Sequence, residues 1–294
     1  MDFLLLLKAA ILGVVEGLTE FLPISSTGHL IIAESLLGFT GNSATVFAIV
    51  IQLGAILAVM TLYRERVAGL IRGLFAAPGI VAGAGLRGSG AALLAQPDTR
   101  LLLNLMCAFL PAMVLGVMFH STIKTVLFNP ITVATMLVIG GFVILWAERR
   151  QHTARVMELD ALHPRDAFKV GLAQAVAMIP GTSRSGATII GGMLFGVARP
   201  VATQFSFFLA IPTMLAATVY DVYKNRAILS MDDFGIIAVG FVAAFIVAFF
   251  TVRFMVGFVS RHSFVPFAWY RIVFGLIVLA SWHFGWVDWS SASH

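Results

Sequence analysis

Charged residues are scarce in this sequence: they make up 11% of its 294 residues, whereas 60% are apolar and the mean hydropathy is +0.97. Soluble globular chains carry about 25% charged residues, so this composition excludes a soluble domain. Several runs of about 18 to 20 residues hold almost no charge, and a helix of that length crosses a hydrocarbon core of roughly 30 Å. The sequence therefore predicts an all-α polytopic membrane protein.

Cysteine is nearly absent as well, because Cys107 stands alone, which excludes a disulfide framework within the chain and a cysteine metal site. The stretch "MDFLLLLKAA" has Asp2 where a secretory signal needs a basic residue, so we expect no cleaved signal. The net charge of +5 does not predict a nucleic-acid partner, because the Lys and Arg residues gather between the apolar runs rather than on one basic face.

The apolar runs predict a single membrane domain, 1–294, with six transmembrane helices and two re-entrant helix hairpins. The hairpins are expected at about 2–37 and 168–197, where Pro, Gly and hydroxyl residues interrupt the apolar sequence. The spans are expected at about 45–63, 101–119, 130–147, 201–221, 234–252 and 269–286.

An internal repeat organises these elements. "EFLPISSTG" (20–28) is echoed by "AMIPGTSRSG" (177–186), about 157 residues later. Repeat A (1–150) and repeat B (160–294) each contain one hairpin and three spans, and an odd number of spans inverts the second copy. Inverted repeats bring their interrupted helices together near the bilayer midplane, so the two polar loops are expected to meet.

Positive charge sets the expected orientation. Segments 64–100, 148–169 and 253–268 carry most of the Lys and Arg residues outside the apolar runs, and the positive-inside rule places all three in the cytoplasm. With six spans and two hairpins that return to their own side, both chain ends then face outward. The first hairpin would enter the bilayer from outside.

The stretch "EGLTEFLPISSTGHL" (16–30) places ionisable residues inside an apolar chain. Glu16 and Glu20 share one helix face and repel each other unless a cation or proton lies between them, although bonding to neighbouring helices is an alternative role. After the proline break, Ser25, Ser26 and Thr27 are candidate N-caps of the next half-helix. A helix N-terminus with free N–H groups binds anions, so this turn is a candidate anion site.

Further residues complete a candidate site. His29 follows Ser26 by three residues, close enough to take the hydroxyl proton if that turn is helical, or else it bonds another helix. In the second loop Arg184 stands next to Ser183, and a guanidinium suits phosphate oxygens; pairing with a glutamate of the first loop is the alternative. Gln52, in the span after the first hairpin, either faces the site or bonds another helix. Carboxylates, a hydroxyl, an imidazole and an arginine are the parts of a phosphoryl-transfer site.

At these residues the sequence resembles a known family. "EGLTEFLPISSTGH" followed by "PGTSRSG" is similar to the two signature motifs of the bacterial undecaprenyl-diphosphate phosphatases of the bacitracin-resistance type, and the resemblance covers almost the whole chain. It implies removal of the terminal phosphate of a C55 polyprenyl diphosphate at the outer face of the bacterial inner membrane, which recycles the carrier lipid for cell-wall synthesis. It also implies a divalent cation, Mg²⁺ or Ca²⁺, bound by the two glutamates. The motif residues fall on Glu16, Glu20, Ser26, His29 and Arg184, with Thr27 and Ser183 as secondary phosphate contacts.

Two other classes compete with this interpretation. The acid-phosphatase-like lipid phosphatases need a histidine soon after their arginine, and the sequence has none between Arg184 and His262. A transporter or flippase of the polyprenyl phosphate is the stronger alternative, because inverted repeats with broken helices are transporter architecture. The oligomeric state stays open, with a homodimer as one option.

Overall fold

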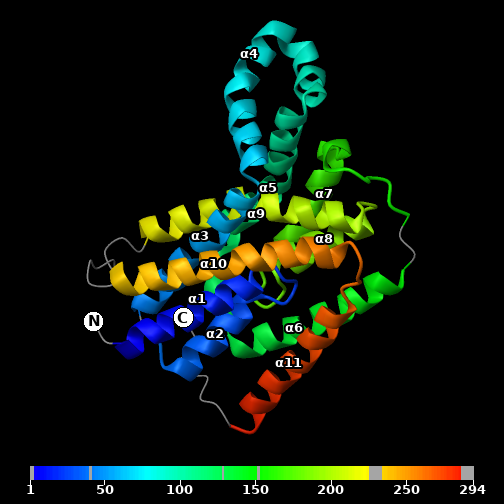
Figure 1. The fold of residues 1–294 in the computed structure, drawn as a ribbon. Coiled ribbons are helices and arrows are strands. Elements are labelled where there is room, and N and C mark those ends of the chain that lie inside the picture. Colours follow the sequence, from blue (N-terminus) through cyan, green and yellow to red (C-terminus); the bar gives the residue numbers. More distant parts are fainter. Residues whose placement is uncertain (1–2, 40–41, 128, 151–152, 225–233, 286–294) are drawn as a thin grey trace.

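The computed structural model describes residues 3–39, 42–127, 129–150, 153–224 and 234–285, and these ranges confirm the all-α prediction (Figure 1). Outside the helices they contain an isolated β-bridge between Val156 and Val197. The α-helices are α1 (Phe3–Thr19), α2 (Ser26–Leu37), α3 (Asn42–Leu62), α4 (Arg64–Ala95), α5 (Pro97–Thr122), α6 (Pro130–Arg149), α7 (Pro164–Val176), α8 (Arg184–Leu194), α9 (Arg199–Lys224), α10 (Phe234–Val259) and α11 (Val265–His283). A π-helical turn, η1 (Ile123–Leu127), and a 3₁₀ turn, η2 (Leu159–Ala161), complete the described elements.

Six helices of the described part are long and apolar enough to cross a membrane, so the chain is a multi-pass membrane protein. Five of them match expected spans. The sixth expected span, 45–63, falls in α3, whose described apolar part is the shorter segment Val46–Leu62. The six candidate spans are Arg64–Gly85, Pro97–Phe119, Pro130–Arg149, Arg199–Lys224, Phe234–Val259 and Val265–His283.

Segment 64–100 lies between two expected spans, so a connecting loop was expected there, and this was wrong because most of the segment is the helix α4. Pro78 lies inside α4, and Gly85 adopts non-helical angles, φ 67° and ψ 167°, that divide it into two helical arms. Figure 1 shows the two arms as a cyan arch that projects from the rest of the molecule. The glycines and arginines of this segment resemble loop sequence, whereas its mean hydropathy suits a helix at a membrane.

Both interrupted apolar regions form pairs of short helices. In the first, α1 ends at Thr19 and α2 begins at Ser26; in the second, α7 ends at Val176 and α8 begins at Arg184. A proline stands in each break, where it cannot continue a helix. The two breaks lie side by side in the centre of the bundle, since Ser185 Oγ donates to the Leu22 carbonyl over 2.8 Å (Figure 1).

The three segments rich in Lys and Arg contact one another in the fold. Arg66 of α4 forms a 2.6 Å ion pair with Asp160, which belongs to the segment after α6. Glu148, at the end of α6, accepts a hydrogen bond from the backbone N–H of Phe264 over 2.8 Å. These contacts join 64–100 to 148–169, and 148–169 to 253–268.

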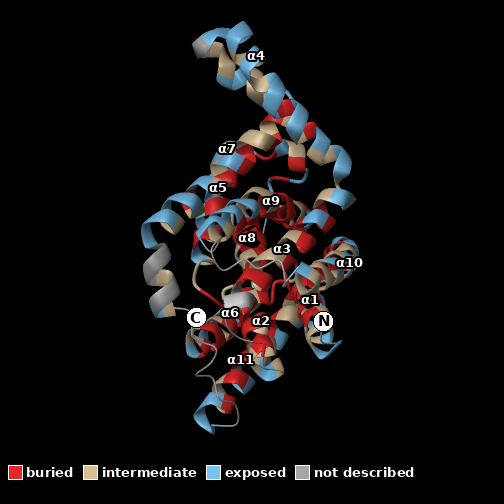
Figure 2. Ribbon diagram, turned by 90° about the vertical axis from the view of Figure 1, so that its left-hand side faces the viewer, coloured by how far each residue is buried: buried red, intermediate tan, exposed pale blue. Residues whose placement is uncertain are grey.

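Buried residues form a continuous centre, red in Figure 2, around the broken helix pairs. Helices α1 and α10 approach so closely that a Cβ on Gly17 would lie 2.6 Å from the Ala244 carbonyl oxygen. Glu16, which precedes Gly17 in α1, is 0% exposed. By contrast, large apolar side chains such as Phe250 and Phe254 are exposed on the outer surface of α10, as contact with lipid allows.

Candidate active site

Each broken helix pair has the same backbone conformation just before its second helix. Ser25 has φ 72° and Ser183 has φ 74°, and they are the non-glycine residues with positive φ in the described chain. They directly precede Ser26 and Arg184, the first residues of α2 and α8. Left-handed angles cost non-glycine residues about 1–3 kcal/mol and gather at functional sites. Both loops therefore hold a strained turn where a helix N-terminus can bind an anion.

Three of the predicted site residues from the two halves meet in one cluster. The Ser26 hydroxyl donates a hydrogen bond to one oxygen of the Glu20 carboxylate. The other Glu20 oxygen accepts from Nη2 of Arg184 over 3.2 Å. The pairing of Arg184 with a first-loop glutamate, left open by the sequence, thus exists here. It places a carboxylate between the hydroxyl and the guanidinium.

One guanidinium nitrogen of Arg184 has no hydrogen-bond partner among the described residues. Its Nη1 donates to the Ser206 carbonyl of α9 over 2.7 Å, and the Ser206 hydroxyl lies 2.6 Å from Thr188 Oγ1. Its Nε is buried and has no hydrogen-bond partner among the described residues. A buried donor without an acceptor is costly, and a phosphate oxygen would satisfy it. Ser206 was not predicted as a site residue, because it carries no motif signal in an apolar helix.

His29 does not bond Ser26, so the expected proton transfer between them lacks its hydrogen bond. Its Nδ1 lies 2.7 Å from the Ser25 carbonyl oxygen, and its Nε2 lies 2.7 Å from the Tyr270 hydroxyl. The imidazole also stacks on Phe274 with ring centroids 4.4 Å apart. These aromatic residues of α11 turn the imidazole toward α11, whereas the Ser26 hydroxyl is held by the first-loop carboxylate. His29 therefore fixes the start of α2 in this structure.

Glu16 is suited to a cation. Both oxygens of its buried carboxylate lack a hydrogen-bond partner in the described residues, an arrangement that a bound cation or proton would relieve. No group of three or more His, Cys, Asp or Glu side chains in the described part could hold a metal alone. Mg²⁺ suits such a site, because it binds through one or two carboxylates together with waters and substrate phosphates. The residues present fit the expected cation if Glu16 and Glu20 share it.

The cluster opens onto a cavity of about 260 Å³ between the two loops. Polar residues from both halves line it: Glu20, Ser25, Ser26, Thr27, Ser183 and Arg184. Gln52 of α3 lines it as well, which supports the first of the two roles expected for this residue.

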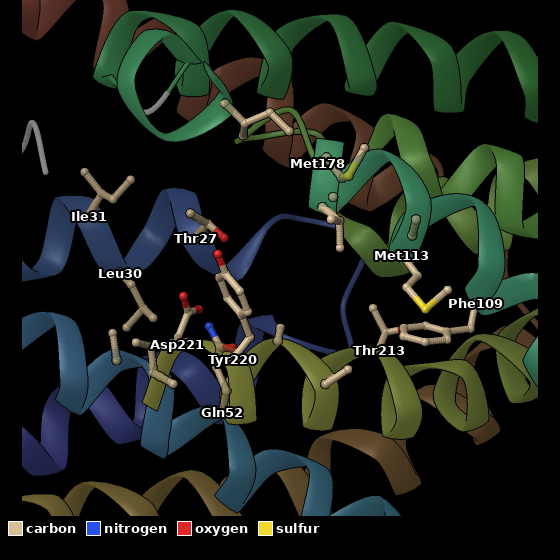
Figure 3. Close-up of a pocket in the computed structure, with 18 of the residues that line it drawn as sticks. Thr27, Leu30, Ile31, Gln52, Phe109, Met113, Met178, Thr213, Tyr220 and Asp221 are labelled. Atoms are coloured by element: carbon tan, nitrogen blue, oxygen red, sulfur yellow. The ribbon is translucent and has the colours of Figure 1, made fainter. Parts of the chain in front are cut away.

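A second cavity, of about 600 Å³, continues from the first, since Thr27, Gln52 and Thr213 line both. Leu30 and Ile31 of α2 and Phe109 and Met113 of α5 make it largely apolar (Figure 3). An apolar cavity joined to a polar one with hydroxyl, carboxylate and guanidinium groups suits a ligand with an anionic head and a hydrocarbon tail.

The fold and the site thus define a multi-pass helical membrane protein with a phosphate-type pocket between two broken helix pairs. The chain belongs to the family of bacitracin resistance protein BacA, whose profile matches residues 9–277. It is 56% identical over 291 residues to an undecaprenyl-diphosphatase of Dechloromonas aromatica, covering 99% of this chain and all of that protein. It is also 55% identical over 292 residues to undecaprenyl-diphosphatase 2 of Rhodospirillum rubrum, with 99% and 100% coverage. The family expected from the two motifs is confirmed.

Proposed function

We infer that this protein hydrolyses undecaprenyl diphosphate to undecaprenyl phosphate and inorganic phosphate, as the names of its relatives state for them. The observation that carries this conclusion is that Arg184, whose buried Nε has no hydrogen-bond partner among the described residues, lines the same cavity as Ser26. The product is the monophosphate carrier lipid, so the enzyme supports cell-wall synthesis and bacitracin resistance.

The proposed chemistry uses the contacts of Ser26. Its Oγ attacks the terminal phosphorus, the bond from that phosphorus to the bridging oxygen breaks, and the lipid monophosphate leaves while Glu20 takes the hydroxyl proton. Arg184 turns from Glu20 to the phosphate oxygens and stabilises their charge. Water then attacks the phosphorus of the phosphoserine, the P–Oγ bond breaks, Glu20 returns its proton to Ser26 Oγ, and inorganic phosphate leaves with the oxygen of the water. His29 acts as a positioning residue for the first turn of α2.

Glu16 and Glu20 are proposed to hold a divalent cation, which when bound neutralises charge on the phosphate oxygens. Replacing Glu16 with glutamine should raise the cation concentration for half-maximal activity by about tenfold or more, because a carboxylate ligand is lost. The measurement is phosphate release from purified protein titrated with Mg²⁺ or Ca²⁺ after treatment with chelator.

Glu34→Gln is the matched control for this titration. Glu34 of α2 is also a buried carboxyl group with one unpartnered oxygen. It lines the apolar cavity, whereas Glu20 lines the polar one. The cation titration of Glu34→Gln should shift less than that of Glu16→Gln, because Glu34 is not a proposed ligand of the cation. A Glu16→Gln protein with an unchanged cation titration would remove Glu16 from the cation site.

The apolar cavity is proposed to hold the first part of the prenyl tail. Ala216 lines this cavity but not the polar one, so Ala216→Trp should fill tail space without touching the reacting atoms. Displacing about two methylenes at ~0.8 kcal/mol each raises KM for the C55 substrate roughly tenfold. The measurement is KM and kcat in mixed micelles.

Val219→Trp is the control, because Val219 lies on the same helix, is 68% exposed and lines neither cavity. It should leave KM unchanged. Equal changes in the two tryptophan variants would contradict this position for the tail.

We propose that the two halves are inverted repeats with re-entrant hairpins. The matching left-handed angles of Ser25 and Ser183, 158 residues apart, support this arrangement, as does the meeting of the two loops. The charge bias supports a site that faces the outer side of the inner membrane. All the proposed site residues come from one chain, so the proposal does not require a homodimer.

One experiment with two parts tests the activity and its orientation. Purified protein in detergent should release phosphate from undecaprenyl diphosphate, whereas a transporter of lipid phosphate would not, since no bond is broken in transport. Intact spheroplasts that overproduce the protein should hydrolyse a short-chain, water-soluble prenyl diphosphate added outside. Activity only after permeabilisation would reverse the orientation.

A further inference from the structure

Arg271 is a buried arginine of α11, 1% exposed, and no described carboxylate forms an ion pair with it. Its guanidinium is instead surrounded by backbone carbonyl oxygens. It donates to Pro23 over 3.0 Å, to Gly181 over 3.0 Å, to Met136 over 3.1 Å and to Leu137 over 3.3 Å. A charged group without a counter-ion in the membrane core is expensive and marks function.

Two of these carbonyls occupy matching places in the two loops. Pro23 precedes Ser26 by three residues, and Gly181 precedes Arg184 by three residues. Gly181 has φ +90°, and a Cβ there would lie 2.3 Å from the Val133 carbonyl oxygen, so this loop is tightly seated. One guanidinium therefore joins the two loops just before the residues that are proposed to act on phosphate.

We propose that Arg271 is a positioning residue that sets the separation of the two loops, and with it the distance between the Ser26 hydroxyl and the Arg184 guanidinium. This inference rests on the proposed function of the site. A planar guanidinium can donate to two separate carbonyls at once, whereas an ammonium is a single point of donation. Misplacement of reacting groups by about 1 Å costs about 10²-fold in rate.

The first test uses Arg271→Gln and Arg271→Lys in purified full-length protein with undecaprenyl diphosphate. Arg271→Gln should lower kcat about 10²-fold while KM stays within about threefold, because the tail cavity is untouched. The kcat of Arg271→Lys should lie within about threefold of the kcat of Arg271→Gln, because the ammonium keeps the charge but cannot join both loops.

Gly140 of α6 gives a second test that leaves Arg271 in place. A Cβ on Gly140 would lie 2.0 Å from Nη2 of Arg271, so Gly140→Ala should displace the guanidinium and lower kcat at least about tenfold. In the Arg271→Gln background the same change should have little further effect, because coupled residues are not additive.

Gly141→Ala is the matched control on the same helix. Its Cβ would meet Ile272 Cγ1 at 2.5 Å and the Ala268 carbonyl oxygen at 2.8 Å, so it disturbs the packing of α6 on α11 without touching the guanidinium. It should lower the thermal midpoint but not kcat. If Arg271→Gln does not fold, the kcat values of Gly140→Ala and Gly141→Ala still test whether the position of the Arg271 guanidinium controls turnover.

Three results would overturn the proposal: a folded Arg271→Gln protein with kcat within about threefold of wild type, multiplicative effects of Gly140→Ala and Arg271→Gln, or equal kcat losses for the two alanine variants. Failure of the proposed function is distinct, because the wild-type protein itself would then release no phosphate.

Discussion

Ser26→Ala should reduce phosphate release from undecaprenyl diphosphate by about 10⁴-fold or more, because removal of a nucleophile is among the most severe single changes in an enzyme. The hydroxyl is placed for this role by its hydrogen bond to Glu20 and by its position at the start of α2. Binding of the lipid should persist, since the apolar cavity and the Arg184 guanidinium remain. Turnover and lipid binding are measured on the same purified protein.

Comparing His29→Ala with Ser26→Ala distinguishes the two candidate acceptors of the Ser26 proton, Glu20 and His29. If Glu20 takes the Ser26 proton, as their hydrogen bond suggests, His29→Ala should cost less than Ser26→Ala, because the imidazole then only orients the first turn of α2. A Ser26→Ala protein that folds, binds lipid and hydrolyses it within about tenfold of wild type would rule out the nucleophile. Water would then attack phosphorus directly.

Arg184→Lys should lose most of the activity although the positive charge is kept. An arginine that stabilises a phosphoryl transition state is commonly worth about 10³–10⁵ in rate, and lysine cannot supply its forked donors. In the structure the guanidinium contacts Glu20 and the Ser206 carbonyl and still has Nε free, three directions that one ammonium cannot serve together. We expect a loss of at least about 10³-fold in kcat/KM.

Ser206→Ala is the control for the Arg184 variant, because its carbonyl, which accepts from the guanidinium, is retained while only the hydroxyl is lost. Ser206→Ala should lower kcat/KM by less than about tenfold, because only one neutral hydrogen bond is lost. An Arg184→Lys protein with near-normal kcat/KM would mean that a point charge suffices and that the forked grip has no role.

The sequence predicted the loops well because their signals are local. Proline stops a helix, and serine or threonine starts the next one, so the breaks at Pro23 and after Val176 were expected where they occur. The echo between the two motifs also led us to expect that the loops meet. What local signals could not predict is which way each side chain turns: His29 is directed by Tyr270 and Phe274, which lie more than 200 residues away in the chain.

Arg271 and α4 were missed for different reasons. Arg271 lies near the start of an expected span, and the signal that could have singled it out is a charge within apolar sequence. Its four carbonyl partners belong to three other segments, so only the folded chain reveals them. In α4, frequent glycine lowered the expected helicity, although the segment is apolar enough for a helix in contact with lipid.

The apolar cavity has a consequence for how rates must be measured. Its rim includes Val117, 79% exposed, and Met113, 42% exposed, on the outer side of α5, where the acyl chains of the bilayer would lie. A prenyl tail can enter sideways through such a rim without leaving the membrane. Collisions then occur in two dimensions, and the rate follows the mole fraction of substrate among the surrounding lipids. Adding inert detergent at constant bulk substrate should slow turnover by surface dilution alone.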